Sequence, residues 1–316
     1  MPGTPSRGNF ATMIINAPPW PNGARAAVAF SFDMDADSVV QVSAAGRLDH
    51  ELHALAYMRY DPVVAVPRLT ALFRSLGVPV TYFVPGWVVE RYPKAVETVL
   101  AAGNEVAHHG YLHEWPTKQT LEQQRETLEK GSALIESISG QRPRGYRAPY
   151  YGVSQQTIDL LIEQGFAYES SLFADDIPIV LQTDSGSLIE LPIPDSVDDY
   201  NQFVSSRAFD YLMTVSAPER AMTVFRAEFD AIHEMGGLWI GVWHPAVSGR
   251  PARAHAMRLL IEHMQAKGDV WFATHEQIAD HVTGLMQRGE WQPRVENLPW
   301  YPNQLPETRH LGKKQD

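Results

Sequence analysis

The sequence lacks cysteine altogether among its 316 residues. This absence excludes disulfide bonds and thiolate metal ligands, so any bound transition metal must be held by histidine and carboxylate side chains. Long apolar runs are also missing, since no segment approaches the ~20 residues that a membrane-spanning helix needs. Positive charge is in deficit, because 26 Lys and Arg stand against 37 Asp and Glu. The resulting net charge of −11 disfavours nucleic acid and anionic membranes as partners.

The remaining composition is that of a soluble globular protein, with 44% hydrophobic and 20% charged residues. The length allows one barrel domain or two ordinary domains. The first residues have neither the basic start nor the apolar run of a secretory signal, so we expect a cytoplasmic protein. Residues 1–24 contain three prolines and a glycine near their end and predict an irregular lead-in: Pro18, Pro19, Pro21 and Gly23.

Apolar strand-like runs alternate with helical patterns from residue 25 to residue 286, about seven times and without a composition break. This order predicts a single α/β domain of parallel strands, closed or nearly closed into a barrel. Predicted helices include Val63–Leu76, Val88–Ala102 and Leu121–Ile138, the last with Thr120 and Gln123 as a capping box. Two segments are less regular: residues 39–60, a loop or irregular helix, and the Pro- and Asp-rich stretch between the predicted strands Phe166–Leu172 and Leu188–Ile193.

The tail at residues 287–316 has too many prolines for a helix. Its aromatic residues Trp291, Trp300 and Tyr301 predict that it packs on the body or on a sister subunit. A homo-oligomer is therefore one expectation from the sequence.

Two polar clusters each follow a predicted strand. His109 and His113 are four residues apart, and a single helical turn would place both imidazoles on one side. Asp33 and Asp35 are two residues apart, so on a strand they would share a face. Two histidines and a carboxylate that leave positions open for water and substrate are typical of a catalytic metal site.

Each cluster also has an ordinary structural interpretation. A pair of histidines four apart is a weak motif, and an Asp cluster after a strand is more often a cap or a solvated turn. Their joint occurrence at strand ends favours a site, because a barrel enzyme keeps its chemistry there. Two further strand ends carry Arg147 with Tyr150, and His244. The arginine could equally be a surface residue and the histidine a satisfied core residue.

At these residues the chain resembles the polysaccharide deacetylase family, the metal-dependent carbohydrate esterase family 4. Over residues 25–285 its ordered motifs are F32-D-M-D35, H109-G-Y-L-H113, R147-A-P-Y150 and V242-W-H244. The first motif departs from the family pattern, because one residue separates the two carboxylates. The spaced form looks like the branch that contains peptidoglycan-deacetylase-like proteins, cyclic-imide hydrolases and allantoinase-like proteins. The acidic fourth motif has only a remnant, Asp198-Asp199-Tyr200.

The resemblance implies a distorted barrel of about seven parallel strands. It also implies that Asp35, His109 and His113 hold one divalent ion, preferably zinc, with Asp33 as the base. The chemistry is consistent with that assignment, since such a metal activates water and polarises a carbonyl. Arg147 would orient Asp33 and keep it ionised, and His244 would protonate the leaving nitrogen. The backbone N–H of Tyr150 would help to stabilise the oxyanion.

The leading hypothesis is therefore a metal-dependent hydrolase of a non-peptide C–N bond. A small cytosolic amide such as a cyclic imide is weakly favoured as substrate over an N-acetylated sugar or peptidoglycan. A catalytically inactive carbohydrate-binding barrel is a second hypothesis, although the complete set of base, ligands and arginine argues against it. A non-haem iron oxygenase, whose metal also takes two histidines and a carboxylate, is a third.

Overall fold

In the computed structural model, which describes residues 13–207, 210–212 and 217–301, the strands form one large mixed sheet. Its hydrogen-bonded order is β10-β1-β2-β3-β4-β5-β7-β6-β12, and β11 also pairs with β1. The strands of this sheet are β1 (Ala26–Asp33), β2 (Val80–Val84), β3 (Glu105–His108), β4 (Gly145–Tyr146), β5 (Tyr168–Glu169), β6 (Ile179–Thr183), β7 (Gly186–Glu190), β10 (Leu238–Trp243), β11 (Val270–Phe272) and β12 (Val295–Asn297). A separate hairpin pairs β8 (Ser205–Arg207) with β9 (Asp210–Leu212).

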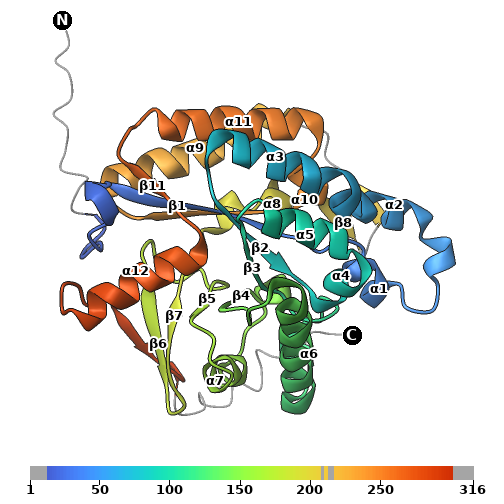
Figure 1. Cartoon of the computed structure of the whole chain (residues 1–316), viewed down its shortest axis with the longest axis horizontal. Coiled ribbons are helices and arrows are strands. Elements are labelled where there is room, and N and C mark those ends of the chain that lie inside the picture. Colours follow the sequence, from blue (N-terminus) through green and yellow to red (C-terminus); the bar gives the residue numbers. More distant parts are fainter. Residues whose placement is uncertain (1–12, 208–209, 213–216, 302–316) are drawn as a thin grey trace, which may run out of the picture.

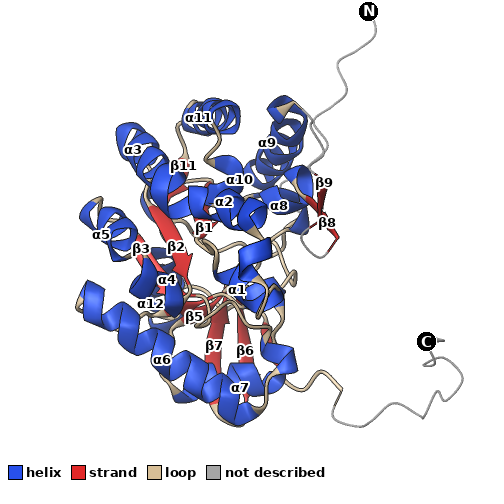
Figure 2. Cartoon of the chain, turned by 90° about the vertical axis from the view of Figure 1, so that its right-hand side faces the viewer, coloured by secondary structure: helices blue, strands red, loops and turns tan. Residues whose placement is uncertain are grey.

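Helices surround this sheet on its outer side (Figures 1 and 2). They are α1 (Ser38–Ser43), α2 (Leu52–Tyr60), α3 (Val66–Leu76), α4 (Gly86–Arg91), α5 (Pro93–Ala101), α6 (Leu121–Ser139), α7 (Gln155–Glu163), α8 (Asp199–Phe203), α9 (Pro218–Met235), α10 (Pro245–Ser248), α11 (Pro251–Gln265) and α12 (His275–Gln287). In Figure 1, α3, α9 and α11 lie above β1, and α6, α7 and α12 lie below it with β5, β6 and β7. The α/β class and the distorted, mostly parallel barrel architecture are confirmed.

The central strand β1 is buried along its whole length. Its alternate residues belong to different clusters, because side chains of a strand point to opposite faces in turn. The large residues Phe30 and Phe32 pack with α3 and β10 in one cluster, against Phe73 and Trp243. The small residues Ala27 and Ala29 face the other cluster, which contains Tyr168 and Ile278. The two faces of β1 therefore pack in different clusters, one with α3 and β10 and the other with β5 and α12.

Several local signals in the sequence act as predicted. Thr120 and Gln123 form the reciprocal capping box of α6, and Gly77 ends α3 with a left-handed φ of 66°. The predicted helix Val88–Ala102 is instead two helices, because Pro93 begins a new one after Arg91. The irregular stretch 39–60 contains α1 and α2, and it runs into a π-helical turn at Asp61–Ala65.

The sheet departs from a simple parallel barrel on its β6 side. The stretch between the predicted strands Phe166–Leu172 and Leu188–Ile193 contains a strand of its own, β6, which pairs antiparallel with β7. Within the described ranges the ladder ends at β10 on one side and at β12 on the other, so the barrel is distorted and its hydrogen-bond ladder is open. None of the helices in those ranges combines the length and hydropathy that a bilayer crossing requires.

The segment after α12 adds to the sheet. Its strand β12 pairs in parallel with β6, and the buried Trp291 donates from Nε1 to the Asn16 carbonyl at 2.9 Å. Trp300 and Tyr301 are exposed. The first half of the lead-in, residues 1–12, and residues 302–316 of the tail lie outside the described residues.

Candidate metal centre

The predicted site residues come together at the carboxyl ends of neighbouring parallel strands. Asp33 is the last residue of β1, and His109 directly follows β3. Arg147 follows β4, and His244 follows β10. Because β10, β1, β2, β3 and β4 are consecutive in the sheet, their ends lie at one edge, where parallel α/β folds place their chemistry.

Three side chains at this edge converge as metal ligands would. Oδ1 of Asp35 lies 3.4 Å from Nε2 of His109 and 3.5 Å from Nε2 of His113. All three residues are buried, at most 5% exposed. Nδ1 of His109 is bonded to the Arg147 carbonyl at 2.8 Å, which turns Nε2 towards Asp35.

The donor set fits a divalent transition metal. Two imidazole nitrogens and one carboxylate oxygen are the ligands zinc takes in catalytic sites, and any fourth position would be left for water or substrate. Oδ1 of Asp35 is buried without a hydrogen-bond partner, which is costly unless a cation or water satisfies it. An ion held by this trio would satisfy that oxygen.

The histidines meet by a different route from the predicted one. No helix forms between His109 and His113, and His113 has a left-handed φ of 58°. The prediction of a single helical turn between the two histidines is therefore wrong. The turn is held instead by Glu114, whose Oε2 accepts from the backbone N–H groups of Tyr111 and Leu112 at 3.2 and 2.8 Å. Glu114 thus caps the turn.

Arg147 is fully buried, and each of its N–H groups has a hydrogen-bond partner at the site. Its Nη1 donates to Asp33 Oδ1 and to the Ser31 hydroxyl, each at 2.8 Å. Its Nε donates to the Ser170 carbonyl at 2.8 Å. Its Nη2 contacts the Ser170 hydroxyl at 3.1 Å and Nε2 of His275 at 3.3 Å. A guanidinium has five N–H donors, so this one is saturated and its position is fixed.

His244 is oriented by a carboxylate from α8. Its Nδ1 lies 2.7 Å from Oδ1 of Asp199, and Nε2 lies 3.9 Å from Oδ2 of Asp35. Asp199 is fully buried and also accepts from the Ser248 hydroxyl at 2.5 Å. The remnant of the fourth motif therefore supplies a residue that the sequence did not assign a role.

A second group, Asp198, Asp199 and His244, is also close enough to hold an ion. The ligand atoms of this group already take part in hydrogen bonds, however. Asp198 accepts from the Tyr151 hydroxyl at 2.6 Å and from the Tyr200 N–H at 2.7 Å, and Asp199 is bonded as described above. We interpret this group as a hydrogen-bond network around His244.

Electrostatics separate the roles of the buried groups. Burial opposes the charged form of Asp35, but His113, His109 and His244 outweigh it and lower the pKa of Asp35 to about 2. Burial lowers the pKa of His113 to about 4, despite the opposing charge of Asp35. Burial also disfavours charged His244, but Asp199, Asp198 and Asp35 raise its pKa well above the ordinary value. His113 is thus neutral, as a ligand must be, and His244 can hold a proton.

A cavity of about 290 Å³ opens directly over this centre. Its walls carry several aromatic residues, and Tyr150 packs edge-on against His113 with ring centroids 4.6 Å apart. Burial raises the pKa of Tyr150 to about 12, so its phenol stays neutral. The backbone of Tyr150 is left-handed, with a φ of 56°, which is uncommon for a residue with a side chain.

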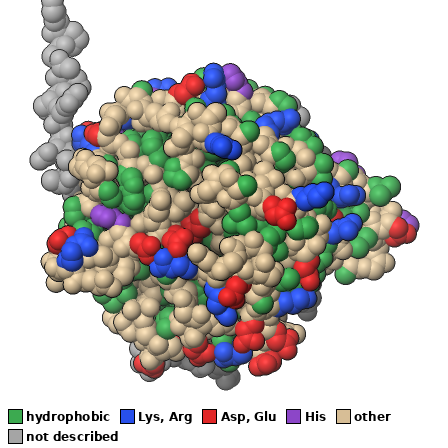
Figure 3. Space-filling model, in the orientation of Figure 1, with side chains coloured by type: hydrophobic (Ala, Val, Ile, Leu, Met, Phe, Trp, Pro, Cys, Tyr) green, Lys and Arg blue, Asp and Glu red, His purple; other side chains and the backbone are tan. Residues whose placement is uncertain are grey.

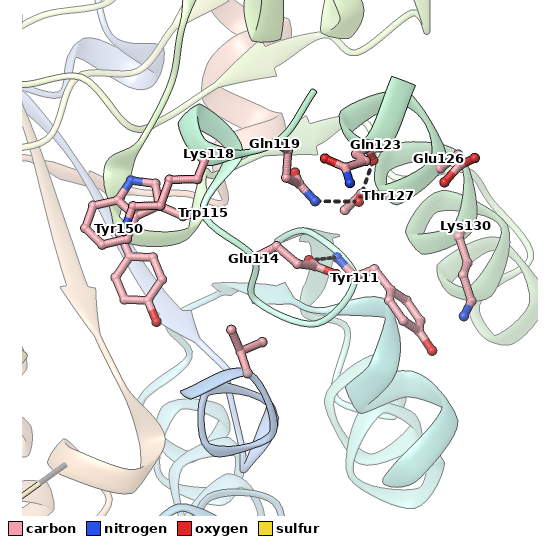
Figure 4. Close-up of a pocket in the computed structure, with 11 residues that line it drawn as sticks. Tyr111, Glu114, Trp115, Lys118, Gln119, Gln123, Glu126, Thr127, Lys130 and Tyr150 are labelled. Carbon is pink, nitrogen blue, oxygen red and sulfur yellow. Dashed lines mark hydrogen bonds between the residues drawn. The ribbon is translucent and has the colours of Figure 1, made fainter. Parts of the chain in front are cut away.

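A second space, a groove of about 700 Å³, lies along α6 (Figure 4). Trp115 and Tyr150 line both spaces. The aromatic faces in the groove are already covered, since Trp115 stacks on Tyr150 and lies under Lys118, and Lys130 lies over Tyr111. Acidic and basic side chains are interspersed over the face shown in Figure 3.

The sequence missed the residues that support the centre from behind. Ser31, Ser170, Asp199 and His275 all contact a predicted site residue. Ser31 could have been inferred, because it is two residues before Asp33 on the same strand and therefore shares its face. Asp199 belongs to the remnant of the fourth motif, but its role was not assigned. Ser170 and His275 come from segments that are distant in sequence and carry no recognisable pattern.

Comparison with known proteins finds a matching family and a similar protein by sequence. The sequence profile of the family described as "Polysaccharide deacetylase" matches residues 55–168. The chain is 30% identical over 245 residues to a peptidoglycan deacetylase of Helicobacter pylori, an alignment that covers 69% of this chain and 83% of that protein.

Solved structures share the fold. A Mycobacterium smegmatis protein, provisionally named a polysaccharide deacetylase, aligns with a TM-score of 0.83 and 37% identity over 92% of this chain and 99% of its own. The Puue allantoinase aligns with a TM-score of 0.74 and 21% identity over 89% of this chain and 98% of its own. At that identity the second likeness concerns the fold alone.

Proposed function

Because the chain belongs to the polysaccharide deacetylase family, whose members hydrolyse C–N bonds other than peptide bonds, we propose that it removes the acyl group from an N-acylated amino sugar. The observation that carries this proposal is the separation of base and acid around one set of metal ligands. Asp33 approaches beside His109, with Oδ2 and Nε2 3.9 Å apart, whereas His244 approaches beside Asp35. Hydrolysis of an amide needs both groups at different positions around the reacting carbon.

Asp35, His109 and His113 would hold one divalent ion, which we propose to be zinc. Such an ion supplies Lewis acidity, because it lowers the pKa of water and polarises a carbonyl oxygen. The imidazole of His109 is fixed by its bond to the Arg147 carbonyl, and His113 is fixed by the turn that Glu114 caps. The ligand positions therefore depend on groups already in place in the folded chain.

The proton transfers are assigned to the chain's own side chains. Asp33, held by Arg147, takes a proton from water as the oxygen of that water forms a bond to the amide carbon. His244, held by Asp199, gives its proton to the nitrogen as the C–N bond breaks. The products are a carboxylic acid and an amine, and one proton has moved from water to Asp33 and another from His244 to nitrogen. The Tyr150 N–H remains our candidate for binding the oxyanion.

An N-acetylated amino sugar is favoured as substrate by the Helicobacter pylori relative, whose name states that it deacetylates peptidoglycan. A small cyclic imide remains a second candidate. The size of the central cavity, about 290 Å³, supports it, because a space of that volume suits a single ring. The sequence alone favoured the imide, and the relatives favour the sugar.

A panel of substrates tests this proposal. Zinc-loaded protein is incubated with chitooligosaccharides, hydantoin and a succinimide-type imide, and acetate release and ring opening are measured separately. We expect acetate from the chitooligosaccharides. Ring opening of an imide without acetate release would favour the second candidate. If the zinc-loaded protein hydrolysed none of these amides, the proposal would be contradicted.

A further inference from the structure

The loop that carries Asp35 leaves the sheet through an unusual backbone conformation. After β1 the chain continues for one residue, with the Met34 N–H bonded to the Phe83 carbonyl at 2.9 Å. Ala36, the residue after Asp35, then adopts a left-handed φ of 47°. A residue with a Cβ disfavours this conformation, so it persists only where surrounding contacts enforce it.

A buried carboxyl group supplies one of these contacts. Oδ2 of Asp61 accepts from the Ala36 N–H at 3.1 Å, and both residues are fully buried. The carbonyl of the same peptide group, that of Asp35, accepts from the N–H and the hydroxyl of Ser38 at 3.2 and 2.7 Å. Both polar atoms of the Asp35–Ala36 peptide group, which precedes the left-handed residue, are thus tied.

Asp61 is held rigidly where it stands. It is the first residue of the π-helical turn Asp61–Ala65 that joins α2 to α3, and π-turns often occur at functional sites. This turn packs so closely against Gly249 that a Cβ atom added to that glycine would lie 2.4 Å from the Ala65 Cβ. The segment after His244 therefore leaves the π-turn little freedom to move.

The carboxyl group of Asp61 has no other described partner. Its Oδ1 is buried without a hydrogen bond. Burial raises the pKa of Asp61 well above its ordinary value, with the Ala36 N–H opposing and the charge of Asp35 adding to the shift. The contact with Ala36 needs only an oxygen acceptor, which an asparagine side chain also offers.

We propose that Asp61 is a positioning residue for the metal centre: its hydrogen bond to Ala36 holds the left-handed turn that presents Asp35 to the ion. This inference rests on the proposed function in one respect, the assignment of Asp35 as a ligand. The acceptor itself, and the turn that it holds, belong to the metal-free fold.

Zinc affinity of the full chain, measured by competition with a chelator, tests the inference. Asp61→Leu keeps the branched shape of the side chain and removes the acceptor, so zinc affinity should fall by about 10–100-fold, the usual effect of removing a group that orients a ligand. Asp61→Asn keeps an acceptor and should stay within about threefold of wild type. Equal losses in both variants, or wild-type affinity in Asp61→Leu, would overturn the proposal.

A second substitution separates positioning from general destabilisation. Ala36→Gly removes the penalty of the left-handed backbone, so in combination with Asp61→Leu it should restore part of the lost affinity. Thr70→Val is the matched control, because Thr70 is buried on α3 and its hydroxyl bonds, within the part of the chain that the structure describes, only to the Tyr82 hydroxyl at 3.3 Å. It should leave zinc affinity unchanged, and an equal loss there would overturn the proposal.

Backbone hydrogen exchange of Ala36 in the metal-free protein provides a readout that does not depend on metal. Asp61→Ala, which leaves space rather than filling it, should increase exchange at Ala36 on the order of 10-fold relative to wild type. If the wild-type protein bound no zinc, the proposed function would fail. Hydrogen exchange at Ala36 would still show whether Asp61 holds the turn. Unchanged exchange in Asp61→Ala would overturn the role of Asp61.

Discussion

Arg147 and Asp33 form a buried ion pair, with Nη1 2.8 Å from Oδ1 and neither side chain more than 5% exposed. Charge alone does not describe this contact, because the same guanidinium also ties Ser31, Ser170 and His275 together. The pair therefore fixes the base relative to several strands at once.

Arg147→Lys should consequently be far from conservative. A lysine keeps the charge but offers three donors on one nitrogen, so partners of the guanidinium are left unsatisfied at about 1–3 kcal/mol each. We expect a clear loss of unfolding free energy in urea and a fall in turnover. Arg125→Lys is the control, since its pair with Glu163 is exposed and should cost less than about 1 kcal/mol. Equal stability of the two variants would contradict the assigned role of Arg147.

Asp199 should control the proton on His244. Asp199→Asn removes the charge that favours the imidazolium, so the pKa of His244 should fall. A general acid works only while protonated, and the alkaline limb of the turnover profile should therefore move to lower pH, with zinc content unchanged. Ser248→Ala removes only a neutral partner of Asp199 and should shift the profile less. An unmoved alkaline limb in Asp199→Asn would argue against His244 as the acid.

His108 should make the metal-free protein sensitive to acid. Burial, supported by the nearby His109 and Arg142, lowers the pKa of His108 from 6.5 to about 3, and the bond to the Leu128 carbonyl opposes this shift. The unfolded chain then binds more protons between these values, so stability is present above pH 6.5 and is lost as pH falls towards 3, by up to about 4–5 kcal/mol. Urea unfolding of His108→Gln should show a flatter dependence over this window. His50→Gln, at an exposed site, should keep the wild-type slope.

Trp291 should stabilise the protein, whereas Trp300 should not. Trp291 is 5% exposed and Trp300 is 51% exposed, so Trp291→Ala should cost about 3–5 kcal/mol and Trp300→Ala little. Thermal unfolding of the two variants measures the difference. Deletion of residues 287–316 tests the oligomer expectation, because a lower mass in solution would show that the tail joins subunits. Similar melting temperatures for the two tryptophan variants would contradict the packing of Trp291.

The parts of the fold that were predictable from the sequence are those with local signals. The capping box at Thr120, the stop at Gly77 and the apolar strand Leu238–Trp243 each determine structure within a few residues. Strand β6 was missed because its partner β7 follows through a tight turn at Asp184 and Ser185, inside a stretch whose prolines and aspartates suggested a loop. The site residues were found because each follows a strand.

The supporting residues could not be predicted in the same way. Asp61 reaches Ala36 across 25 positions, and His275 reaches Arg147 across 128. Such contacts depend on how the helices pack, and a single buried aspartate or histidine has no spacing that reveals its partner. The turn at His113 was wrong for a related reason, since its left-handed backbone is enforced by Glu114 and surrounding contacts rather than by helical propensity.

Zinc binding by Asp33→Asn and Asp35→Asn tests the central claim, the separation of base and ligand, most directly. Zinc per chain is measured by elemental analysis, and turnover is measured with and without excess zinc. Asp33→Asn should keep its zinc and lose about 10²–10⁴-fold in turnover, because only a proton acceptor has been removed. Asp35→Asn should lose zinc and regain part of its activity when zinc is added. Rescue of Asp33→Asn by excess zinc, together with full zinc content in an inactive Asp35→Asn, would show that the two aspartates have the opposite roles.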